Sequence, residues 1–271
     1  MRIIRFLGKD GKTHSGCDVK DNSASIVNMD SSGQFVDTKK RVKIKSIKPL
    51  IAPAAIFCIG LNYRLHAEET GLKIPDYPVV FMKNPASVTS DGSEIIIPES
   101  CIDPPQVDYE AELAVVIGRL AKNVKKEQAF DYVAGYTCAN DISAREWQKH
   151  AGAKQWIKGK SFDTFCPVGP FLVTRDEIQD PHALDIQCRV NGQVLQKSST
   201  SDMIFSINEI IEYLSESATL LPGTLILTGT PSGVGFTRNP PKYLLPGDIL
   251  ETEIESIGTL TNFVKKTTQE E

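Results

Sequence analysis

The sequence lacks close cysteine pairs and long apolar runs. Its six cysteines are widely separated, and no two of them are spaced as C-x-x-C. This spacing argues against a zinc site built on cysteines. We expect six reduced core thiols in a cytosolic protein, and the alternative is a secreted protein with disulfides. No segment approaches the roughly 20 apolar residues that a transmembrane helix needs. The start, "MRIIRFLGKDGK", turns to glycine and charge too early for a secretory signal.

A surplus of charge of either sign is also missing. The chain has 30 Lys and Arg against 34 Asp and Glu, a formal net charge of −4 and a pI of about 5.7. This balance gives no reason to expect nucleic acid or an anionic membrane as a partner. Hydrophobic residues make up 41% of the chain and charged residues 24%, as in a globular protein. We expect a cytoplasmic location.

Short strand-like segments dominate the pattern. Residues 1–50 are rich in Lys, Asp, Ser and Gly, and they predict a small N-terminal β-rich subdomain. From residue 51 to 271 we expect the main domain, in which short β-rich segments end at Gly, Pro, Asp or Asn. The segment "SINEIIEYLSES" predicts a helix, because Ser206 and Glu209 form a capping-box signature. The fold class is therefore α+β and β-rich, a mixed sheet or sandwich with a few covering helices.

The segment "VDYEAELAVVIG" (107–118) is a predicted strand that carries acids. Strand side chains alternate between faces, so Asp108, Glu110 and Glu112 share one face and the apolar residues share the other. Carboxylates two residues apart on one face repel each other. Either that face is wet, or a cation lies on it. Since repulsion is expected, we also expect that Glu110→Ala leaves the fold intact.

A third carboxylate falls in "YTCANDISAREWQ", where a strand ends and a helix begins. Asp141 is either an N-cap of that helix or a side chain that converges on the face of Glu110 and Glu112. Three carboxylates without nearby His or Cys would select a hard cation, Mg²⁺, Mn²⁺ or Ca²⁺. The pattern leaves both interpretations open.

The segment "NYRLHAEETG" predicts a two-turn helix with Asn62 as N-cap and Gly71 as its stop. His66 and Glu69 are three residues apart and share one helix face. A carboxylate beside an imidazole raises its basicity, so this pair is suited to take a proton from water. A solvated surface ion pair explains the spacing equally well.

Two further segments carry polar groups near predicted strand ends. "TGTPSGVG" (228–235) lacks the Gly-Lys-[Ser/Thr] ending of a phosphate-binding loop, which excludes nucleotide binding. Its hydroxyls and backbone N–H groups are suited to hold a carboxylate. In "KGKSFDTFCPVGP", Lys160 is either a solvated surface charge or a side chain held against a pocket.

Taken together, these motifs resemble the fumarylacetoacetate hydrolase family. The resemblance covers residues 51–258 and lies in the shorter branch, which includes acylpyruvate hydrolases, oxaloacetate decarboxylases and hydroxyheptadienedioate isomerases. Six segments occur in the family's order: "IGLNYRLHAEETG", "PVVFMKNPAS", "VDYEAELAVVIG", "GYTCANDISAREWQ", "GKSFDTFCPVGP" and "LTGTPSGVG".

The resemblance implies a β-sandwich-like roll, a homodimer and a divalent cation, Mg²⁺ or Mn²⁺. It places Asp108 outside the metal ligands. By matching position, the implied metal ligands are Glu110, Glu112 and Asp141, the catalytic residues are His66, Glu69, Lys160 and Gln148, and the substrate-binding residues are Thr230 and Arg145.

The activity implied is cleavage of a C–C bond in a small 2-oxo acid. The cation would stabilise the enolate formed in acylpyruvate hydrolysis or oxaloacetate decarboxylation. The alternatives are an isomerase or hydratase of a dienol acid in aromatic catabolism, and a non-enzymatic metal-binding scaffold. Some acylpyruvate hydrolases carry arginine where this chain has Leu61, so the substrate carboxylate would need another cation, with Arg64 and Arg145 as candidates.

Overall fold

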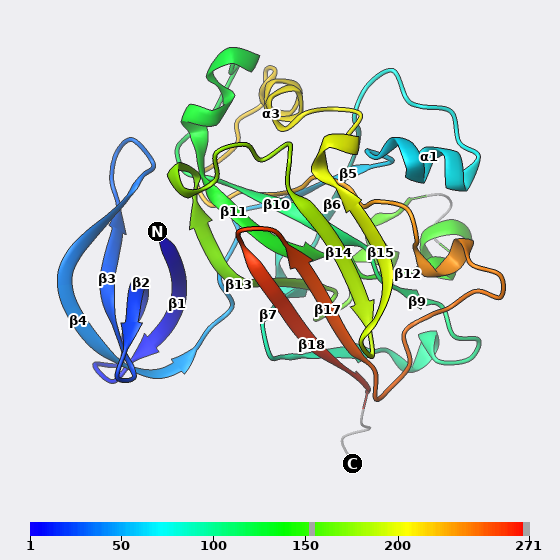
Figure 1. The fold of residues 1–271 in the computed structure, drawn as a ribbon, viewed down its shortest axis with the longest axis horizontal. Helices are drawn as coiled ribbons and strands as arrows, with labels where there is room; N and C mark the ends of the chain where they lie inside the picture. The colour runs from blue at the N-terminus through cyan, green and yellow to red at the C-terminus, as the bar shows by residue number, and fades with distance from the viewer. Residues whose placement is uncertain (152–154, 268–271) are drawn as a thin grey trace.

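In this computed structural model, residues 1–151 and 155–267 are described (Figure 1). They form a strand-rich fold with few helices. The α-helices are α1 (Arg64–Thr70), α2 (Ile157–Lys160) and α3 (Ile207–Ser215). The strands are β1 (Arg2–Gly8), β2 (Thr13–Lys20), β3 (Ser23–Met29), β4 (Phe35–Ile47), β5 (Ile56–Gly60), β6 (Val79–Lys83), β7 (Val88–Ser90), β8 (Glu94–Ile97), β9 (Val107–Asp108), β10 (Ala111–Ile117), β11 (Val133–Asn140), β12 (Ser143–Ala144), β13 (Cys166–Thr174), β14 (Asp185–Val190), β15 (Gln193–Ser199), β16 (Leu225–Leu227), β17 (Ile249–Ile254) and β18 (Gly258–Lys266).

Two large sheets form the body of the molecule. The larger follows the order β2-β3-β4-β1-β13-β11-β10-β16-β5-β6, with β7 beside β13. The second follows the order β15-β14-β17-β18-β8, and its strands pack across β10, β11 and β13 (Figure 1). A short pair, β12-β9, lies apart from both. The predicted β-rich α+β fold, a sandwich-like roll with a few covering helices, is confirmed.

The first four strands lie together at one end of the molecule (Figure 1). They are antiparallel, and β1 continues into the main sheet by pairing with β13, where Arg2 lies opposite Val173 and Ile3 opposite Leu172. The division of the chain into residues 1–50 and 51–271 stays a prediction.

Strand β10 lies in the middle of the larger sheet and is buried along its whole length. Leu113 and Val115 pack into the core that the second sheet covers, whereas Ala114 and Val116 belong to a separate apolar cluster on the opposite face. Glu112 shares the face of Ala114 and Val116 and is only 2% exposed. The predicted alternation is confirmed within β10, and the face that carries Glu112 is not wet. The predicted strand over 107–118 is not continuous, because the N–H groups of Tyr109 and Glu110 bond to the side chains of Asp108 and Asn140, and β9 pairs with β12 outside the larger sheet.

Helix α3 begins as the sequence predicts. The side chain of Ser206 and that of Glu209 form a reciprocal capping box, and Ile207, Ile210 and Ile211 are buried against the core. The predicted core position of the cysteines is also confirmed, since all six are free and buried. Among the helices of residues 1–151 and 155–267, none is long and apolar enough to cross a membrane.

Helix α1 ends at Gly71, as predicted, but its start differs. Tyr63 is the N-cap residue, and Gly71 adopts the left-handed conformation with φ of 65°. The prediction of Asn62 as N-cap is wrong. Its buried amide instead donates to the carbonyl of Thr228 at 2.7 Å and accepts from the N–H of Phe205 at 2.8 Å. These bonds hold the start of α1 against two distant segments.

Candidate metal centre and active site

Three buried carboxylates converge at one end of β10. Pairing of β10 with β11 places Ala111 opposite Asn140, so the residues that flank this pair, Glu110 and Asp141, become neighbours. The N–H of Asp141 donates to the carbonyl of Glu110 at 2.8 Å. One oxygen each of Glu110, Glu112 and Asp141 lies within 4.8 Å of the others. The structure thus brings the three predicted ligands together, and their role as ligands stays a prediction.

Asp141 does not cap a helix, because both of its oxygens are bound by lysines. Lys83 Nζ donates to Oδ1 and Lys160 Nζ to Oδ2, each at 2.6 Å. Lys83 is 1% exposed and comes from the end of β6. The sequence analysis missed it, although Val79, Phe81 and Lys83 alternate onto one strand face and the lysine occupies an inward position.

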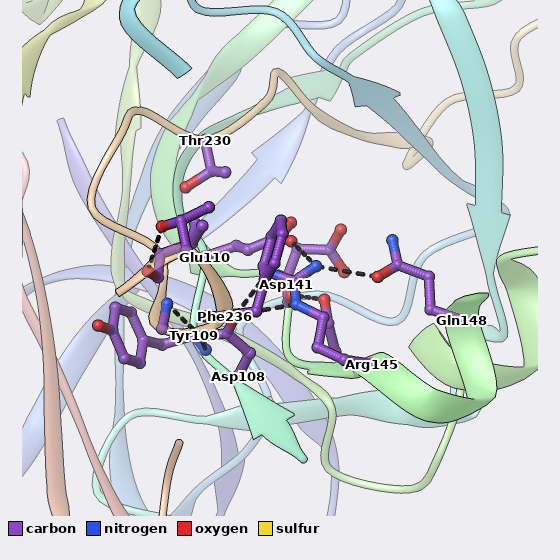
Figure 2. A network of polar contacts seen from close by, with 12 residues as sticks. Asp108, Tyr109, Glu110, Asp141, Arg145, Gln148, Thr230 and Phe236 are labelled. Atoms are coloured by element: carbon purple, nitrogen blue, oxygen red, sulfur yellow. Dashed lines mark hydrogen bonds and ion pairs between the residues drawn. The ribbon is translucent and has the colours of Figure 1, made fainter. Parts of the chain in front are cut away.

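Glu110 contacts two cations. Lys160 Nζ lies 2.7 Å from its Oε2, and Arg145 Nη1 lies 2.7 Å from its Oε1 (Figure 2). Burial opposes ionisation, but these two charges lower the pKa of Glu110 to about 2. Lys160 is 1% exposed, so it is not a solvated surface charge. Burial alone would lower its pKa, yet Asp141 and Glu110 raise it, so Lys160 stays protonated.

Glu112 has a different environment. Its Oε2 accepts a hydrogen bond from the N–H of Gly229 at 2.6 Å. Burial, together with the charges of Asp141 and Glu110, raises the pKa of Glu112 well above its usual value. Asp108, Glu110, Glu112 and Asp141 share three cations, Lys83, Lys160 and Arg145, so ionisation of Glu112 would leave one negative charge without an offset. A divalent cation would relieve this, and a set of carboxylate oxygens fits a hard ion such as Mg²⁺ or Mn²⁺.

The glycine-rich loop at 228–235 binds carboxylates, as its sequence suggests. These carboxylates belong to side chains of the protein itself and not to a ligand. Three of its backbone N–H groups donate to side chains of three different elements. Gly229 donates to Glu112 at 2.6 Å, Gly233 to Glu69 at 2.9 Å and Gly235 to Asp108 at 2.7 Å. The loop therefore positions the acidic side chains of the site.

His66 and Glu69 form the pair predicted for α1. His66 Nδ1 lies 2.9 Å from Glu69 Oε2, and His66 is 8% exposed, so this is not a solvated surface pair. Glu69 Oε1 accepts from the N–H of Gly233 at 2.9 Å and from Thr237 Oγ1 at 2.8 Å. Although partial burial opposes it, hydrogen bonds from His66, Gly233 and Thr237 lower the pKa of Glu69. Nε2 is therefore the ring nitrogen left for a substrate or water.

Arg145 is buried between two carboxylates, and its Nη2 makes no hydrogen bond within the described residues although it lies 2.7 Å from Asp108. Its guanidinium contacts Asp108 at 2.7 and 2.8 Å, Glu110 at 2.7 Å and Gln148 Oε1 at 2.9 Å (Figure 2). It orients Gln148 and anchors Glu110, so it offers few free donors to a substrate carboxylate. Arg64 donates to the carbonyl of Met203 at 3.2 Å and does not line the cavity beside the triad. The substrate-binding role of Arg145 stays a prediction.

Thr230 also lies beside the triad, with its hydroxyl occupied. Its Oγ1 donates to the carbonyl of Ala111 at 3.0 Å and accepts from Gln196 Nε2 at 2.8 Å. Because the single hydroxyl proton is directed at Ala111, Thr230 has only a lone pair to offer a ligand in this arrangement. Its predicted role in substrate binding is not tested by this geometry.

A cavity of about 160 Å³ joins these groups. It is smaller than the roughly 300–1,000 Å³ of sites for drug-sized ligands, and it suits a small acid. A larger cavity, of about 440 Å³, lies between the N-terminal strands and the main sheet, but no carboxylate lines it. The smaller cavity is lined by Ile59, Gly60, Leu61, His66, Thr70, Leu72, Phe81, Glu110, Glu112, Arg145, Gln148, Lys149, Trp156, Lys160, Thr230 and Phe236.

Comparisons with known proteins agree with this arrangement. The mitochondrial oxaloacetate tautomerase of Xenopus laevis is 47% identical over 222 residues, which cover 82% of this chain and 69% of the relative. The solved structure of 5-carboxymethyl-2-hydroxymuconate delta-isomerase from Mycobacterium smegmatis is 34% identical, with a TM-score of 0.83 over 98% of this chain and 100% of that chain. That of 2-hydroxyhepta-2,4-diene-1,7-dioate isomerase from Mycobacterium marinum is 37% identical, with a TM-score of 0.81 over 99% of this chain and 100% of that chain.

A family model described as "Fumarylacetoacetate (FAA) hydrolase C-terminal" matches residues 55–265. This range contains all three carboxylates, the His66–Glu69 pair and the glycine-rich loop. Sequence, fold and site therefore agree that the chain belongs to the fumarylacetoacetate hydrolase family.

Proposed function

We propose that this protein catalyses enol–keto tautomerisation of a small 2-oxo dicarboxylic acid, with oxaloacetate as the substrate. The observation that carries the proposal is that His66, Glu110 and Glu112 line one cavity of about 160 Å³. Glu69 holds His66 from behind, and Asp141 completes the carboxylate triad beside the cavity. One small ligand can therefore contact both a group that transfers protons, His66, and a set of carboxylates suited to hold a divalent cation. The names of the tautomerase and isomerase relatives support a reaction of this class.

A divalent cation at the triad, Mg²⁺ or Mn²⁺, would supply Lewis acidity that favours negative charge on the C2 oxygen of the substrate. Lys160, held protonated between Glu110 and Asp141, adds positive potential on the same side. These charges make the enol hydroxyl more acidic, because they stabilise the oxygen that loses the proton.

His66 then transfers the proton. The enol O–H bond breaks as Nε2 accepts its proton, the C2=O double bond forms, and the electron pair of C2=C3 takes the proton at C3. Nδ1 of the ring is bound to Glu69 Oε2 at 2.9 Å, so the carboxylate fixes the ring and stabilises the transient imidazolium. The same nitrogen accepts and returns the proton, and no net proton is consumed.

Cleavage of a C–C bond is the second candidate. It would proceed by acylpyruvate hydrolysis or oxaloacetate decarboxylation, and the specific observation in its favour is that His66 lines the same cavity as Glu110 and Glu112. Isomerisation of a longer dienol acid would use the same proton transfer, but the small cavity favours a four-carbon acid. A non-enzymatic scaffold would need the triad but not the pair beside it.

The test follows the enol form of oxaloacetate by its ultraviolet absorbance after chelator treatment and after Mg²⁺ or Mn²⁺ is restored. Pyruvate, measured in the same samples with lactate dehydrogenase, reports decarboxylation. We expect the metal-loaded protein to accelerate enol loss beyond a matched solution of metal without protein. Loss of enol at the rate of that solution would overturn the proposal, and fast pyruvate release would favour the second candidate.

A homodimer remains part of the proposal, as does a 2-oxo acid as the small-molecule partner. The names of several relatives place those proteins in mitochondria. The cytoplasmic location expected from the sequence stays a prediction for this chain.

A further inference from the structure

One cation on the cavity wall differs from the rest. Lys149 lines the cavity with Gln148, Arg145 and Phe236. Within residues 1–151 and 155–267, no carboxylate oxygen lies within 4.0 Å of its ammonium, whereas Arg145 and Lys160 each contact two carboxylates. Lys149 therefore adds a positive charge to the cavity that the protein does not pair.

An aromatic ring holds this ammonium in place. Lys149 Nζ lies 3.7 Å from the centroid of the Phe236 ring, and the guanidinium carbon of Arg145 lies 4.4 Å from the same centroid. The backbone that carries this ring is held by the N–H of Phe236, which donates to Asp108 at 3.1 Å. Lys149 is an exposed residue, and the partial burial of its ammonium and the neighbouring charge of Arg145 lower its pKa. A ring quadrupole offsets only part of a cation's charge, so an anion beside Lys149 would be stabilised.

The position of Lys149 relates it to the triad. Arg145 Nη1 lies 2.7 Å from Glu110 and donates to Gln148 at 2.9 Å (Figure 2). Lys149 follows Gln148 in the π-helical turn Trp147–Ala151. This series of contacts leads along the cavity wall from the carboxylates to Lys149. Because one cavity of about 160 Å³ contains both ends, a single small ligand can reach both.

We propose that Lys149 binds the distal carboxylate of the substrate and selects 2-oxo dicarboxylic acids over 2-oxo acids whose distal end is neutral. The inference rests on the proposed function, which places the 2-oxo carboxylate end at the triad. Arg145 is less suited to the distal end, because its charge is already paired with Asp108 and Glu110, its Nε and Nη1 donate to Asp108 and Gln148, and its Nη2 is buried against Asp108.

The test compares Lys149→Met and Lys149→Arg with wild type, using oxaloacetate as substrate and 2-oxobutanoate as a competitor that carries a methyl group in place of the distal carboxylate. Loss of a charge-assisted hydrogen bond should raise KM for oxaloacetate about 10- to 100-fold in Lys149→Met, with a much smaller change in kcat. The inhibition constant of 2-oxobutanoate should change little, and Lys149→Arg should recover most of the affinity for oxaloacetate.

Two controls separate binding from folding. Lys158 is an exposed lysine whose Nζ also lies over an aromatic ring, 4.4 Å from the centroid of Phe162, but it does not line the cavity. The Lys158→Met variant should therefore leave KM for oxaloacetate unchanged. Oxalate has no distal group, so the shift that oxalate and Mg²⁺ produce in the melting temperature should be equal in wild type and Lys149→Met.

Three results would overturn the inference. They are an unchanged KM in Lys149→Met, an equal loss of affinity for 2-oxobutanoate, and a failure of arginine to restore binding. If wild type does not turn over oxaloacetate, the proposed function fails. The ratio of the dissociation constants for oxaloacetate and 2-oxobutanoate, measured by calorimetry with Mg²⁺, still decides the role of Lys149.

Discussion

Glu110 and Glu112 lie two residues apart in the sequence, yet their electrostatic environments are opposite. Glu110 contacts Lys160 and Arg145, and its pKa falls to about 2. Glu112 accepts a backbone hydrogen bond from Gly229, and burial beside Asp141 and Glu110 raises its pKa. The repulsion expected between the two acids therefore raises the pKa of Glu112, whereas nearby cations stabilise the ionised form of Glu110. Variants of the two residues should for this reason have opposite effects on stability.

Glu112→Gln should stabilise the metal-free protein at neutral pH. A carboxyl whose folded pKa is raised binds its proton more tightly in the folded state, so its contribution to stability is present below about pH 4.5 and is lost as pH rises through the folded pKa. In chelator, the free energy of unfolding of wild type should fall from pH 5 to pH 8 relative to that of Glu112→Gln. Urea unfolding at several pH values measures this, and parallel profiles would contradict it.

Glu110→Gln should have the opposite effect in the metal-free protein. Sequence reasoning expected that removing Glu110 would relieve repulsion, but the structure shows that it would leave Lys160 and Arg145 each with one carboxylate fewer. We expect a loss of about 1–3 kcal/mol in the free energy of unfolding, below the 3–5 kcal/mol of a fully broken buried pair, because both cations keep another partner. Equal or greater stability than wild type would show that the repulsion interpretation was right.

The sequence was sufficient to place the acids but not their partners. The period-2 pattern identifies the face of β10 that carries Glu112, because alternation is a local property of a strand, and Glu110 lies one residue before that strand. Lys83 and Lys160 meet Asp141 and Glu110 across 58 and 50 residues of chain. Such contacts depend on how β6 and α2 pack around the sheet, and no local spacing encodes them.

The start of α1 shows the same limit. An Asn two residues before a helix is a good N-cap by local preference, yet Asn62 bonds to Thr228 and Phe205, which are 166 and 143 residues away. Tertiary bonds to a buried amide prevailed over the local capping preference. Lys149 is another residue whose position depends on tertiary contacts. The sequence shows only a lysine after Gln148, whereas in the structure Lys149 contacts the ring of Phe236 and lines the cavity.

Glu69→Gln should slow catalysis more than it weakens the fold. Glutamine keeps an oxygen that accepts from Gly233 and Thr237, so α1 stays bound to the loop, but it cannot stabilise an imidazolium as a carboxylate does. We expect a loss of about 10²-fold in the kcat of tautomerisation. The melting temperature should change by only a few degrees. Thr237→Ala is the matched control, since it removes a bond of the loop and keeps the carboxylate.

His66→Ala separates the reactions that this site is suited to perform. Tautomerisation and acylpyruvate hydrolysis both need a base, so each should fall by on the order of 10²–10⁴ when general-base catalysis is lost. Decarboxylation of oxaloacetate needs the positive charge of the bound cation and Lys160 but no attacking water. Its rate should therefore fall much less. Glu112→Ala should abolish all three. The measurement is the ratio of each activity to decarboxylation, in wild type and His66→Ala, at one Mg²⁺ concentration.

An unchanged ratio would give His66 a different role. Its partner Glu69 binds the N–H of Gly233 and Thr237 Oγ1, so loss of the imidazole also loosens the contact between α1 and the glycine-rich loop. If His66 acts mainly by holding α1 over the cavity, all activities should decline together, and the affinity for oxalate should decline with them. If it acts as the base, oxalate should bind His66→Ala as tightly as wild type, because oxalate has no enol form and needs no proton transfer. Oxalate affinity, measured by calorimetry with Mg²⁺, thus distinguishes a proton-transfer role from a gating role even where every rate has fallen.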